Sequence, residues 1–442
     1  MENLRNAPLD LVLEEARARY AEARPMSRAA HENACRFMPG GNTRTVLYHG
    51  PFPLRAERGE GAYLFDADGH RYLNLLGEYT AGLFGHSHPV IMKAIDAAQA
   101  VGMNLGAHNL AEAKLAELVT ERFPAIEMVR FTNSGTEANL MAVATCCHVT
   151  ARKKVLVFDG GYHGGLLYFG GGGIPINAPH DFIVAPFNDI ERTSRLIAEH
   201  GADLACVIVE PMIGSGGCIP ADRAFLYMLR AQTIEVGAKL IFDEVMTSRF
   251  GAHGAGNLFG VRPDMMTLGK WVGGGMSFGA FGGAAETMAL YDPTRSDGLP
   301  HAGTFNNNIF SMTAGVAALS EIFPSSEALK LHARGDALRT DINQIFADAG
   351  VALSATGMGS LMNFHGVADT VTTPHELVQS NDAAKELLFL DMLERGYYFA
   401  RRGFIAVSTV VTDGELADFK QALTFAVDAR RSALPQRLSS AA

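Results

Sequence analysis

The sequence predicts an α/β fold organised around a mainly parallel, seven-stranded sheet. Seven short and almost continuously apolar runs lie between residues 129 and 281, a composition typical of strands that are buried on both faces. Helical patterns separate several of these runs; in residues 224–236, Leu226, Leu229 and Ile234 are expected to share one face. Alternating strands and helices indicate a parallel sheet covered by helices. The runs are residues 129–131, 155–158, 182–185, 205–209, 240–242, 265–268 and 278–281.

We expect three stretches along the chain. Residues 1–75 hold a charged helix over residues 9–23 and a hairpin whose turn is residues 66–69 (DADG). Residues 76–325 form the large domain that contains the seven strands. Residues 326–442 mix helices (326–349 and 384–394) with short strands near 361–364 and 404–407, and predict a smaller α+β domain that the N-terminal segment completes. The last four residues, 439–442, are expected to be disordered.

Composition narrows the classes of function. The net charge of −10 argues against nucleic acid or an anionic membrane as the main partner. The 15 histidines show no paired spacing on a helix, so no metal site is expected. Five scattered cysteines are typical of reduced thiols, and neither a signal peptide nor a membrane-spanning apolar run is evident. We therefore expect a cytoplasmic protein without a membrane partner.

A lysine and a carboxylate follow two of the predicted strands. Lys270 comes just after the run 265–268 and precedes a glycine-rich stretch, and Asp243 ends the run 239–242. In open α/β sheets the carboxyl ends of the strands face the ligand crevice. Pyridoxal phosphate (PLP) needs a lysine for its Schiff base and an acid beside its pyridine nitrogen. A strand-end lysine alone would more often be structural, but together with Asp243 it predicts a PLP site.

Two further segments follow strands and suit the same ligand. Ser134, Gly135 and Thr136 open a helix, where free backbone N–H groups and hydroxyls can bind a phosphate. The alternative is a simple capping box made by Ser134 with Glu137. Tyr162 lies among glycines that allow a flat ring to approach it, although a mobile glycine-rich loop would have the same composition.

Taken as a set, these segments resemble a class III aminotransferase of the fold type I PLP enzymes. The resemblance covers nearly the whole chain. Residues 41–47 (GNTRTVL), 78–82 (EYTAG) and 275–282 (GMSFGAFG) resemble β-amino acid (β-phenylalanine) aminotransferases and, beyond them, the glutamate-1-semialdehyde aminomutase branch. Residues 306–308 (NNN) depart from the aminomutase pattern, which puts aminomutase activity in doubt. The motifs shared with the whole class are residues 132–139 (TNSGTEAN), 161–164 (GYHG), 210–211 (EP), 242–246 (FDEVM) and 267–270 (TLGK).

The resemblance implies a role for each residue of this set. Lys270 would bind the cofactor covalently and move a proton, and Asp243 would pair with the pyridine nitrogen. Tyr162 would stack on the ring, and Glu210 would support the cofactor from a neighbouring strand end. The phosphate would be held by Ser134, Gly135 and Thr136, joined by Thr304 of the partner subunit in a homodimer with shared active sites.

Transamination requires a site for an amino donor and a keto acid, so a carboxylate-binding arginine is expected. Arg44 is the first candidate, by similarity to the β-amino acid enzymes, and Arg402 is the second; either could instead form a surface ion pair. Tyr79, Phe84, Met276 and Phe281 could line a pocket or belong to the core. The leading function is transfer of the amino group of a β-phenylalanine-like donor to 2-oxoglutarate or pyruvate. The alternatives are a broad-specificity amine transaminase, a glutamate-1-semialdehyde aminomutase and a non-catalytic binding protein.

Overall fold

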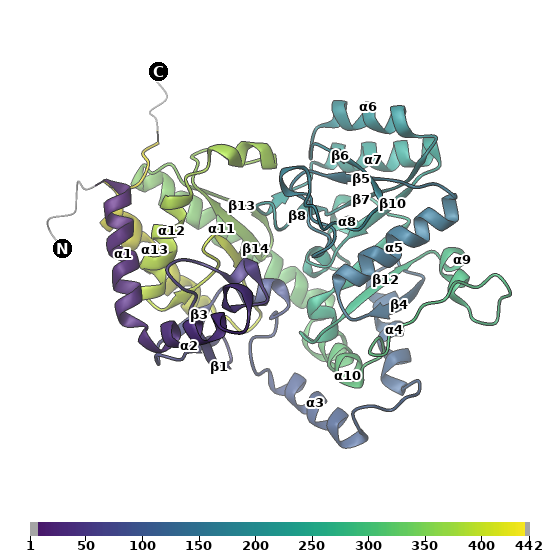
Figure 1. Cartoon of the computed structure of the whole chain (residues 1–442), viewed down its shortest axis with the longest axis horizontal. Helices are drawn as coiled ribbons and strands as arrows, with labels where there is room; N and C mark the ends of the chain where they lie inside the picture. Colours follow the sequence, from purple (N-terminus) through teal and green to yellow (C-terminus); the bar gives the residue numbers. More distant parts are fainter. Residues whose placement is uncertain (1–7, 438–442) are drawn as a thin grey trace.

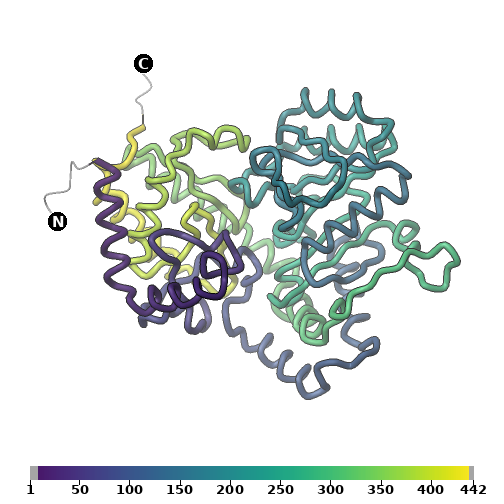
Figure 2. The backbone as a smooth tube through the Cα atoms, viewed as in Figure 1, coloured from purple at the N-terminus to yellow at the C-terminus, as the bar shows by residue number. Residues whose placement is uncertain are grey.

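The computed structural model describes residues 8–437 and contains two adjoining bodies of secondary structure (Figure 1). The larger body holds the middle of the chain, and the smaller one combines the N-terminal and C-terminal segments. The backbone trace leaves the small body after the first strands, builds the large body and then returns (Figure 2). The expectation for residues 439–442 lies outside the described residues.

All seven predicted apolar runs form strands of one sheet, in the order β4-β12-β11-β10-β7-β5-β6. β12 runs antiparallel to β4 and β11, whereas the pairs β10–β11, β10–β7, β5–β7 and β5–β6 are parallel. The prediction of a mainly parallel seven-stranded sheet is therefore confirmed. The strands are β4 (Met128–Thr132), β5 (Lys154–Phe158), β6 (Asp181–Ala185), β7 (Leu204–Val209), β10 (Lys239–Asp243), β11 (Met265–Gly269) and β12 (Gly279–Gly283).

Helices bury both faces of this sheet, which explains why its strands are apolar throughout. Ile241 of β10 packs in one cluster with Ala138 of α5 (Gly135–Thr150), and its neighbour Leu240 packs in another with Leu226 of α7 (Arg223–Val236). The expectation for Ile234 was wrong: its side chain is 66% exposed, and the buried face of α7 continues through Thr233 instead. Thr233 can be buried because its hydroxyl donates a hydrogen bond to the Leu229 carbonyl at 2.8 Å.

The smaller body has two sheets, in the orders β1-β2-β3-β15 and β13-β14-β16. β15 pairs in parallel with β3, so the C-terminal segment extends the N-terminal hairpin. This pairing supports the proposed domain boundaries at residues 75 and 325. The strands are β1 (Ala56–Glu60), β2 (Tyr63–Asp66), β3 (Arg71–Asn74), β13 (Ser354–Met358), β14 (Leu361–His365), β15 (Tyr397–Tyr398) and β16 (Phe404–Ala406), and the helices are α1 (Leu9–Ala23), α2 (Pro25–Cys35), α11 (Ser325–Ala349), α12 (Asp382–Glu394) and α13 (Asp413–Arg430).

The remaining helices and a short hairpin surround the large sheet. α3 and α4 precede the first strand of this sheet and both contact α10. Among residues 8–437, no helix combines the length and the apolar character that crossing a membrane requires. The remaining elements are α3 (Pro89–Val101), α4 (Leu110–Arg122), α6 (Ile190–His200), α8 (Ala255–Phe259), α9 (Ala285–Met288), α10 (Ile309–Ala317), β8 (Met212–Ile213) and β9 (Ile219–Pro220).

A buried polar network joins the N-terminal helices to the hairpin of the small body. The Arg24 guanidinium donates to the Tyr72 hydroxyl at 2.9 Å, and that hydroxyl donates to Asp66 Oδ2 at 2.6 Å. Arg24 and Asp66 are 2% and 0% exposed, and their nearest charged atoms lie 3.6 Å apart. Removing one partner of such a pair leaves a buried charge uncompensated.

Arg24→Ala should therefore lower the free energy of unfolding by about 3–5 kcal/mol. Chemical unfolding followed by circular dichroism measures this change. Arg36→Ala removes a solvent-exposed arginine just after α2 and serves as the control, with an expected change within about 0.5 kcal/mol. Equal changes in the two variants would contradict a stabilising role for the buried network.

Candidate active site

The site is built at the carboxyl ends of β7, β10 and β11, where parallel strands leave their polar terminal residues at one edge. Asp243 is the last residue of β10 and pairs in register with Thr267 of β11. Lys270 follows β11 immediately and has a left-handed backbone, with φ of 58°. The structure thus brings the predicted lysine and carboxylate to adjacent positions on the same sheet edge.

Asp243 is 4% exposed, and three donors compensate its carboxylate. Asn139 Nδ2 and His163 Nδ1 contact Oδ2 at 2.7 and 2.8 Å, and the Val245 N–H donates to Oδ1 at 3.0 Å. Thr267 in turn donates to Asn139 Oδ1 at 2.6 Å, which orients the amide. The carboxylate is fixed in place and retains acceptor capacity on Oδ1 for another donor.

The sequence motifs contain Asn139, His163 and Thr267, but the sequence alone predicts no role for these three residues. A usable signal exists for Asn139, which interrupts the apolar face of α5 between Ala138 and Ala142. A polar side chain on a buried helix face requires a hydrogen-bond partner. For His163 and Thr267 the partner becomes visible only when separate strand ends meet in the folded chain.

The Lys270 amine donates a hydrogen bond to the Tyr79 carbonyl. Burial lowers the pKa of this amine to about 8, against the opposing attraction of Asp243 and Glu210. Desolvation disfavours the charged ammonium form. The lowered pKa makes the unprotonated amine, which is the nucleophilic form, more accessible than in an exposed lysine.

Ser134 is the N-cap of α5, and its hydroxyl accepts from the Glu137 N–H at 3.2 Å. The Glu137 carboxylate accepts from the Asn133 N–H at 2.9 Å instead of reaching the Ser134 N–H, so the pair is not the reciprocal capping box. The first N–H groups of α5 lack partners within the helix, as at any helix start. The segment can therefore serve both as a cap and as an anion site.

Close packing explains the glycines around this helix start. A Cβ on Gly135 would lie 2.8 Å from Val245 Cγ2, and a Cβ on Gly164 would lie 2.2 Å from Thr136 Oγ1. The helix start therefore fits tightly between the turn that follows β10 and the loop that carries Tyr162. The structure brings Ser134, Gly135 and Thr136 to the same sheet edge as Asp243.

Glu210 follows β7 and supports the Tyr162 loop. Its carboxylate accepts from the Tyr162 N–H and from the Gly214 N–H, each at 2.9 Å. Burial raises the pKa of Glu210 to about 7, although nearby His163 favours the charged form. The Tyr162 side chain remains 43% exposed toward the cleft, with Tyr168 edge-on at a centroid distance of 5.8 Å. One face of the Tyr162 ring is thus available for stacking.

Arg44 and Arg402 converge on a single turn, residues 77–80. Arg44 forms an ion pair with Glu78, and the Arg402 guanidinium lies 5.3 Å from the Tyr79 ring centroid. Arg402 also donates to the Ser215 carbonyl at 2.9 Å. Because the Lys270 amine donates to the Tyr79 carbonyl, both arginines reach the surroundings of the lysine.

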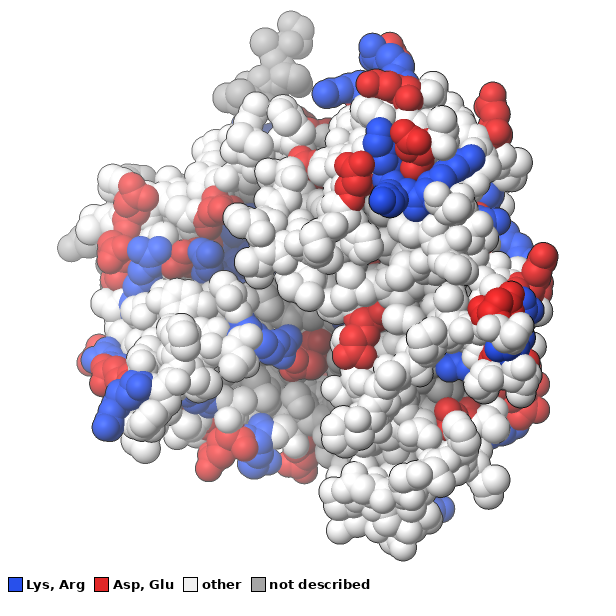
Figure 3. All heavy atoms as spheres, turned by 45° about the vertical axis from the view of Figure 1, so that its right-hand side comes forward, with Lys and Arg blue, Asp and Glu red and all other residues white. Residues whose placement is uncertain are grey.

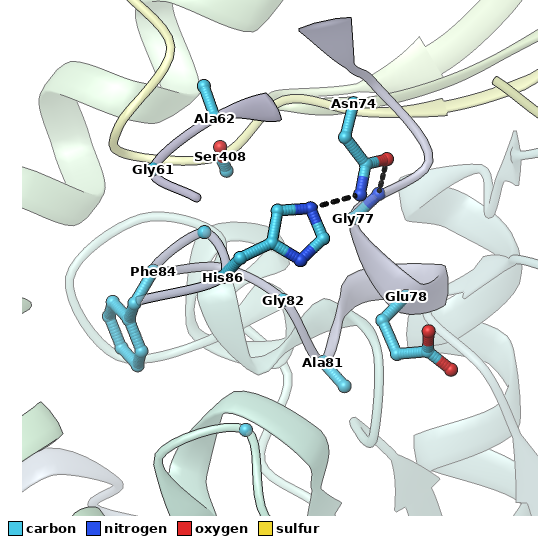
Figure 4. Close-up of a pocket in the computed structure, with 12 residues that line it drawn as sticks. Gly61, Ala62, Asn74, Gly77, Glu78, Ala81, Gly82, Phe84, His86 and Ser408 are labelled. Atoms are coloured by element: carbon cyan, nitrogen blue, oxygen red, sulfur yellow. Dashed lines mark hydrogen bonds between the residues drawn. The ribbon is translucent and has the colours of Figure 1, made fainter. Parts of the chain in front are cut away.

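Of the four apolar pocket candidates, two are core residues. Phe281 and Phe84 are 0% and 3% exposed and belong to separate hydrophobic clusters. Tyr79 is 8% exposed and stacks under Arg402, and Met276 is partly buried against the core. The core alternative therefore holds for Phe281, whereas Phe84 belongs to the core and also lines a cavity of about 210 Å³ together with Glu78 and Gly275 (Figure 4).

Thr304 lies in the exposed segment that precedes α10. Its exposed side chain lines a cavity of about 760 Å³ together with residues 103–109, and within residues 8–437 no hydrogen bond links it to Ser134, Gly135 or Thr136. The following asparagines are structural here. Asn306 accepts from Asn133 Nδ2 at 3.1 Å, and Asn308 caps α10.

A buried carboxylate and a strand-end lysine on an open α/β sheet define the class of fold type I PLP enzymes. A family model for class III aminotransferases matches residues 47–170 and 172–423. The β-phenylalanine transaminase of Variovorax paradoxus is 48% identical over 431 residues, which cover 98% of this chain and 99% of the relative. A glutamate-1-semialdehyde 2,1-aminomutase of Thermodesulfovibrio yellowstonii is 35% identical over 86% of this chain and 94% of its own.

Solved structures agree with these matches. The crystal structure of a β-phenylalanine aminotransferase from Variovorax paradoxus superposes with a TM-score of 0.95, with 48% identity, over 97% of this chain and 100% of its own. A transaminase with PLP bound superposes with a TM-score of 0.83, with 32% identity, over 92% of this chain and 98% of its own. This chain belongs to the class III aminotransferase family and is a PLP-dependent aminotransferase.

The described residues fit the cofactor. The fixed Asp243 carboxylate retains acceptor capacity. The start of α5 packs so closely against Val245 that position 135 accepts only a glycine, which has no Cβ. Nε2 of His163, the histidine that contacts Asp243, is buried without a hydrogen-bond partner in the described chain. An orphaned buried nitrogen of this kind is frequent where a ligand or water completes the site.

Acylation of Lys270 in protein freed of PLP should rise with pH, with a midpoint near 8, since only the unprotonated amine reacts. Competitive labelling at a series of pH values, followed by peptide mass spectrometry, measures this midpoint. Lys330, whose side chain is 70% exposed on α11, gives an internal reference for reagent reactivity. A midpoint for Lys270 at the ordinary lysine value of 10.5 would refute the desolvated environment.

Proposed function

We propose that this aminotransferase moves the amino group of a β-amino acid with an aryl side chain to a keto acid such as 2-oxoglutarate or pyruvate. The observation that carries the proposal is the convergence of Arg44 and Arg402 on the turn that contacts Lys270. Two guanidinium groups near one amine can bind a carboxylate in each half of the reaction. The 48% identity to a β-phenylalanine transaminase over nearly the whole chain supports the choice of donor.

In this proposal, Lys270 would hold the cofactor, and its unprotonated amine would take a proton from the substrate carbon that bears the amino group. Asp243 would hold the proton on the pyridine nitrogen, because Asn139 and His163 fix the position of its carboxylate. When bound, PLP supplies the electron sink for the pair of electrons left by the broken C–H bond. The Tyr162 ring would stack on the cofactor ring.

The phosphate is assigned to the start of α5, where Ser134, Gly135 and Thr136 present N–H groups and hydroxyls. Glu210 acts as a positioning residue, because its two hydrogen bonds hold the Tyr162 loop and the Gly214 turn together. The shared sheet edge and the close packing of Gly135 and Gly164 support these assignments.

A homodimer with shared active sites accounts for the surface around Thr304. Large apolar side chains are exposed there without cover from their own chain, and exposed apolar patches mark interaction sites. In this dimer, Thr304 of the partner subunit would join Ser134, Gly135 and Thr136 at the phosphate. Five free thiols favour a reducing, cytoplasmic environment. The exposed apolar residues are Val101 (66%), Met103 (59%), Leu105 (42%), Leu110 (94%) and Phe305 (57%).

One observation favours a second candidate, a broad-specificity amine transaminase. The Arg44 charge is already neutralised by Glu78, so a donor without a carboxylate meets no unpaired charge at this point. The aminomutase alternative has less support, because Asn306 and Asn308 here hold the α5 and α10 starts.

The direct test is the visible spectrum of the purified holoenzyme during addition of β-phenylalanine without an acceptor. The cofactor absorption band should bleach and then return when 2-oxoglutarate or pyruvate is added, because the amino group is first stored and then released. A band that β-phenylalanine leaves unchanged would reject the donor and keep the cofactor assignment.

Arg44→Ala should reduce kcat/KM for β-phenylalanine by about 10- to 100-fold, the loss expected for a charge-assisted bidentate contact. Turnover of 1-phenylethylamine, which has no carboxylate, should persist. Arg58→Ala removes an exposed arginine of β1 and is the matched control. If both donors lose activity equally in Arg44→Ala, Arg44 does not select the carboxylate.

A further inference from the structure

Three consecutive non-glycine residues adopt left-handed backbone conformations at the edge of the site. The φ angles of Glu78, Tyr79 and Thr80 are 49°, 49° and 83°. Non-glycine residues rarely adopt this region, and they concentrate where a side chain has to be held for function. A run of three such residues therefore indicates a role beyond reversing the direction of the chain.

Hydrogen bonds before and after the turn hold this conformation. Asn74 Oδ1 accepts from the Leu76 N–H at 2.9 Å and from the Gly77 N–H at 3.1 Å, and Asn74 Nδ2 contacts His86 Nε2 at 3.0 Å (Figure 4). The Gly82 N–H closes the turn on the Gly77 carbonyl at 2.9 Å. The position of the Glu78 side chain is consequently set by the turn.

The turn directs Glu78 to Arg44. In Figure 4 the Glu78 carboxylate points away from the His86 ring, and it forms the ion pair with the Arg44 guanidinium. Within residues 8–437 the Arg44 guanidinium has no other hydrogen-bond acceptor. Arg44 and Glu78 both line a cavity of about 410 Å³ that also contains Leu47, Tyr48 and Tyr398. Basic and acidic side chains lie at the edge of the hollow between the two bodies (Figure 3).

Exposure makes this ion pair easy to exchange. The side chains of Arg44 and Glu78 are 43% and 58% exposed, and pairs in such contact with water contribute little net attraction. A substrate carboxylate that binds the guanidinium through two parallel hydrogen bonds can replace Glu78. When the substrate presents an uncharged group instead, Glu78 can stay and keep the arginine neutralised.

We propose that Glu78 is a specificity-determining residue that competes with the substrate carboxylate for Arg44. It weakens binding of carboxylates, and it allows the same pocket to accept groups without charge. The inference rests on the proposed function in one respect, the placement of the substrate carboxylate at Arg44. It concerns donor and acceptor alike, because both halves of transamination use one pocket.

Glu78→Gln tests this competition while keeping the size of the side chain. The dissociation constant of 3-phenylpropanoate, which is β-phenylalanine without its amino group, should fall about three- to fivefold, measured by calorimetry on the holoenzyme. The KM of the keto acid acceptor should fall in parallel. In contrast, kcat/KM for 1-phenylethylamine should decrease, because Arg44 then faces the uncharged methyl group of this donor without its counter-ion.

Glu60→Gln is the matched control, since Glu60 forms an exposed ion pair with Arg58 at 2.9 Å on β1. It should leave the three quantities unchanged. Opposite changes for carboxylates and for the amine in Glu78→Gln support the proposal, even if β-phenylalanine is not a donor for the wild type. Unchanged 3-phenylpropanoate binding, or an equal loss of all activities, would overturn it and leave Glu78 with a structural role only.

Discussion

The structure depends on burying one carboxylate, that of Asp243, at the end of the central strand β10. A charge in this position is costly unless donors surround it. The donors come from three separate segments: Asn139 from α5, His163 from the loop after β5, and the Val245 N–H from the turn after β10. The compensation of this single charge therefore fixes the helix start, the aromatic loop and the strand end relative to each other.

Burial shifts the neighbouring ionisable groups in opposite directions. It lowers the pKa of Lys270 and raises the pKa of Glu210, because desolvation penalises each charged form. Both shifts favour the neutral form of the group, and perturbed pKa values of this kind cluster at functional sites. The same parallel-sheet edge thus supplies both the fixed charge and the adjustable groups.

The substrate side of the cleft is built differently, from the turn that follows β3 of the small body. Tyr79 joins this turn to the large body through its carbonyl, which accepts from Lys270, and to the small body through its ring, which lies beneath Arg402. Arg44 reaches the same turn through Glu78. The candidate cofactor residues are therefore held by the sheet, whereas the candidate carboxylate-binding residues are held by a turn with left-handed backbone conformations that lies between the two bodies.

The sequence by itself determined the seven strands, the strand-end positions of Lys270 and Asp243, and the α5 start, because these features depend on local periodicity and on the common polarity of parallel strands. The tertiary structure alone decided the pairing of β15 with β3, the Asp243 network of Asn139 and His163, and the Arg44–Glu78 pair. Each of these joins residues far apart in the chain, so no local pattern records them. The exposure of Ile234 shows the same limit, since which face of a helix is buried depends on the neighbours it meets.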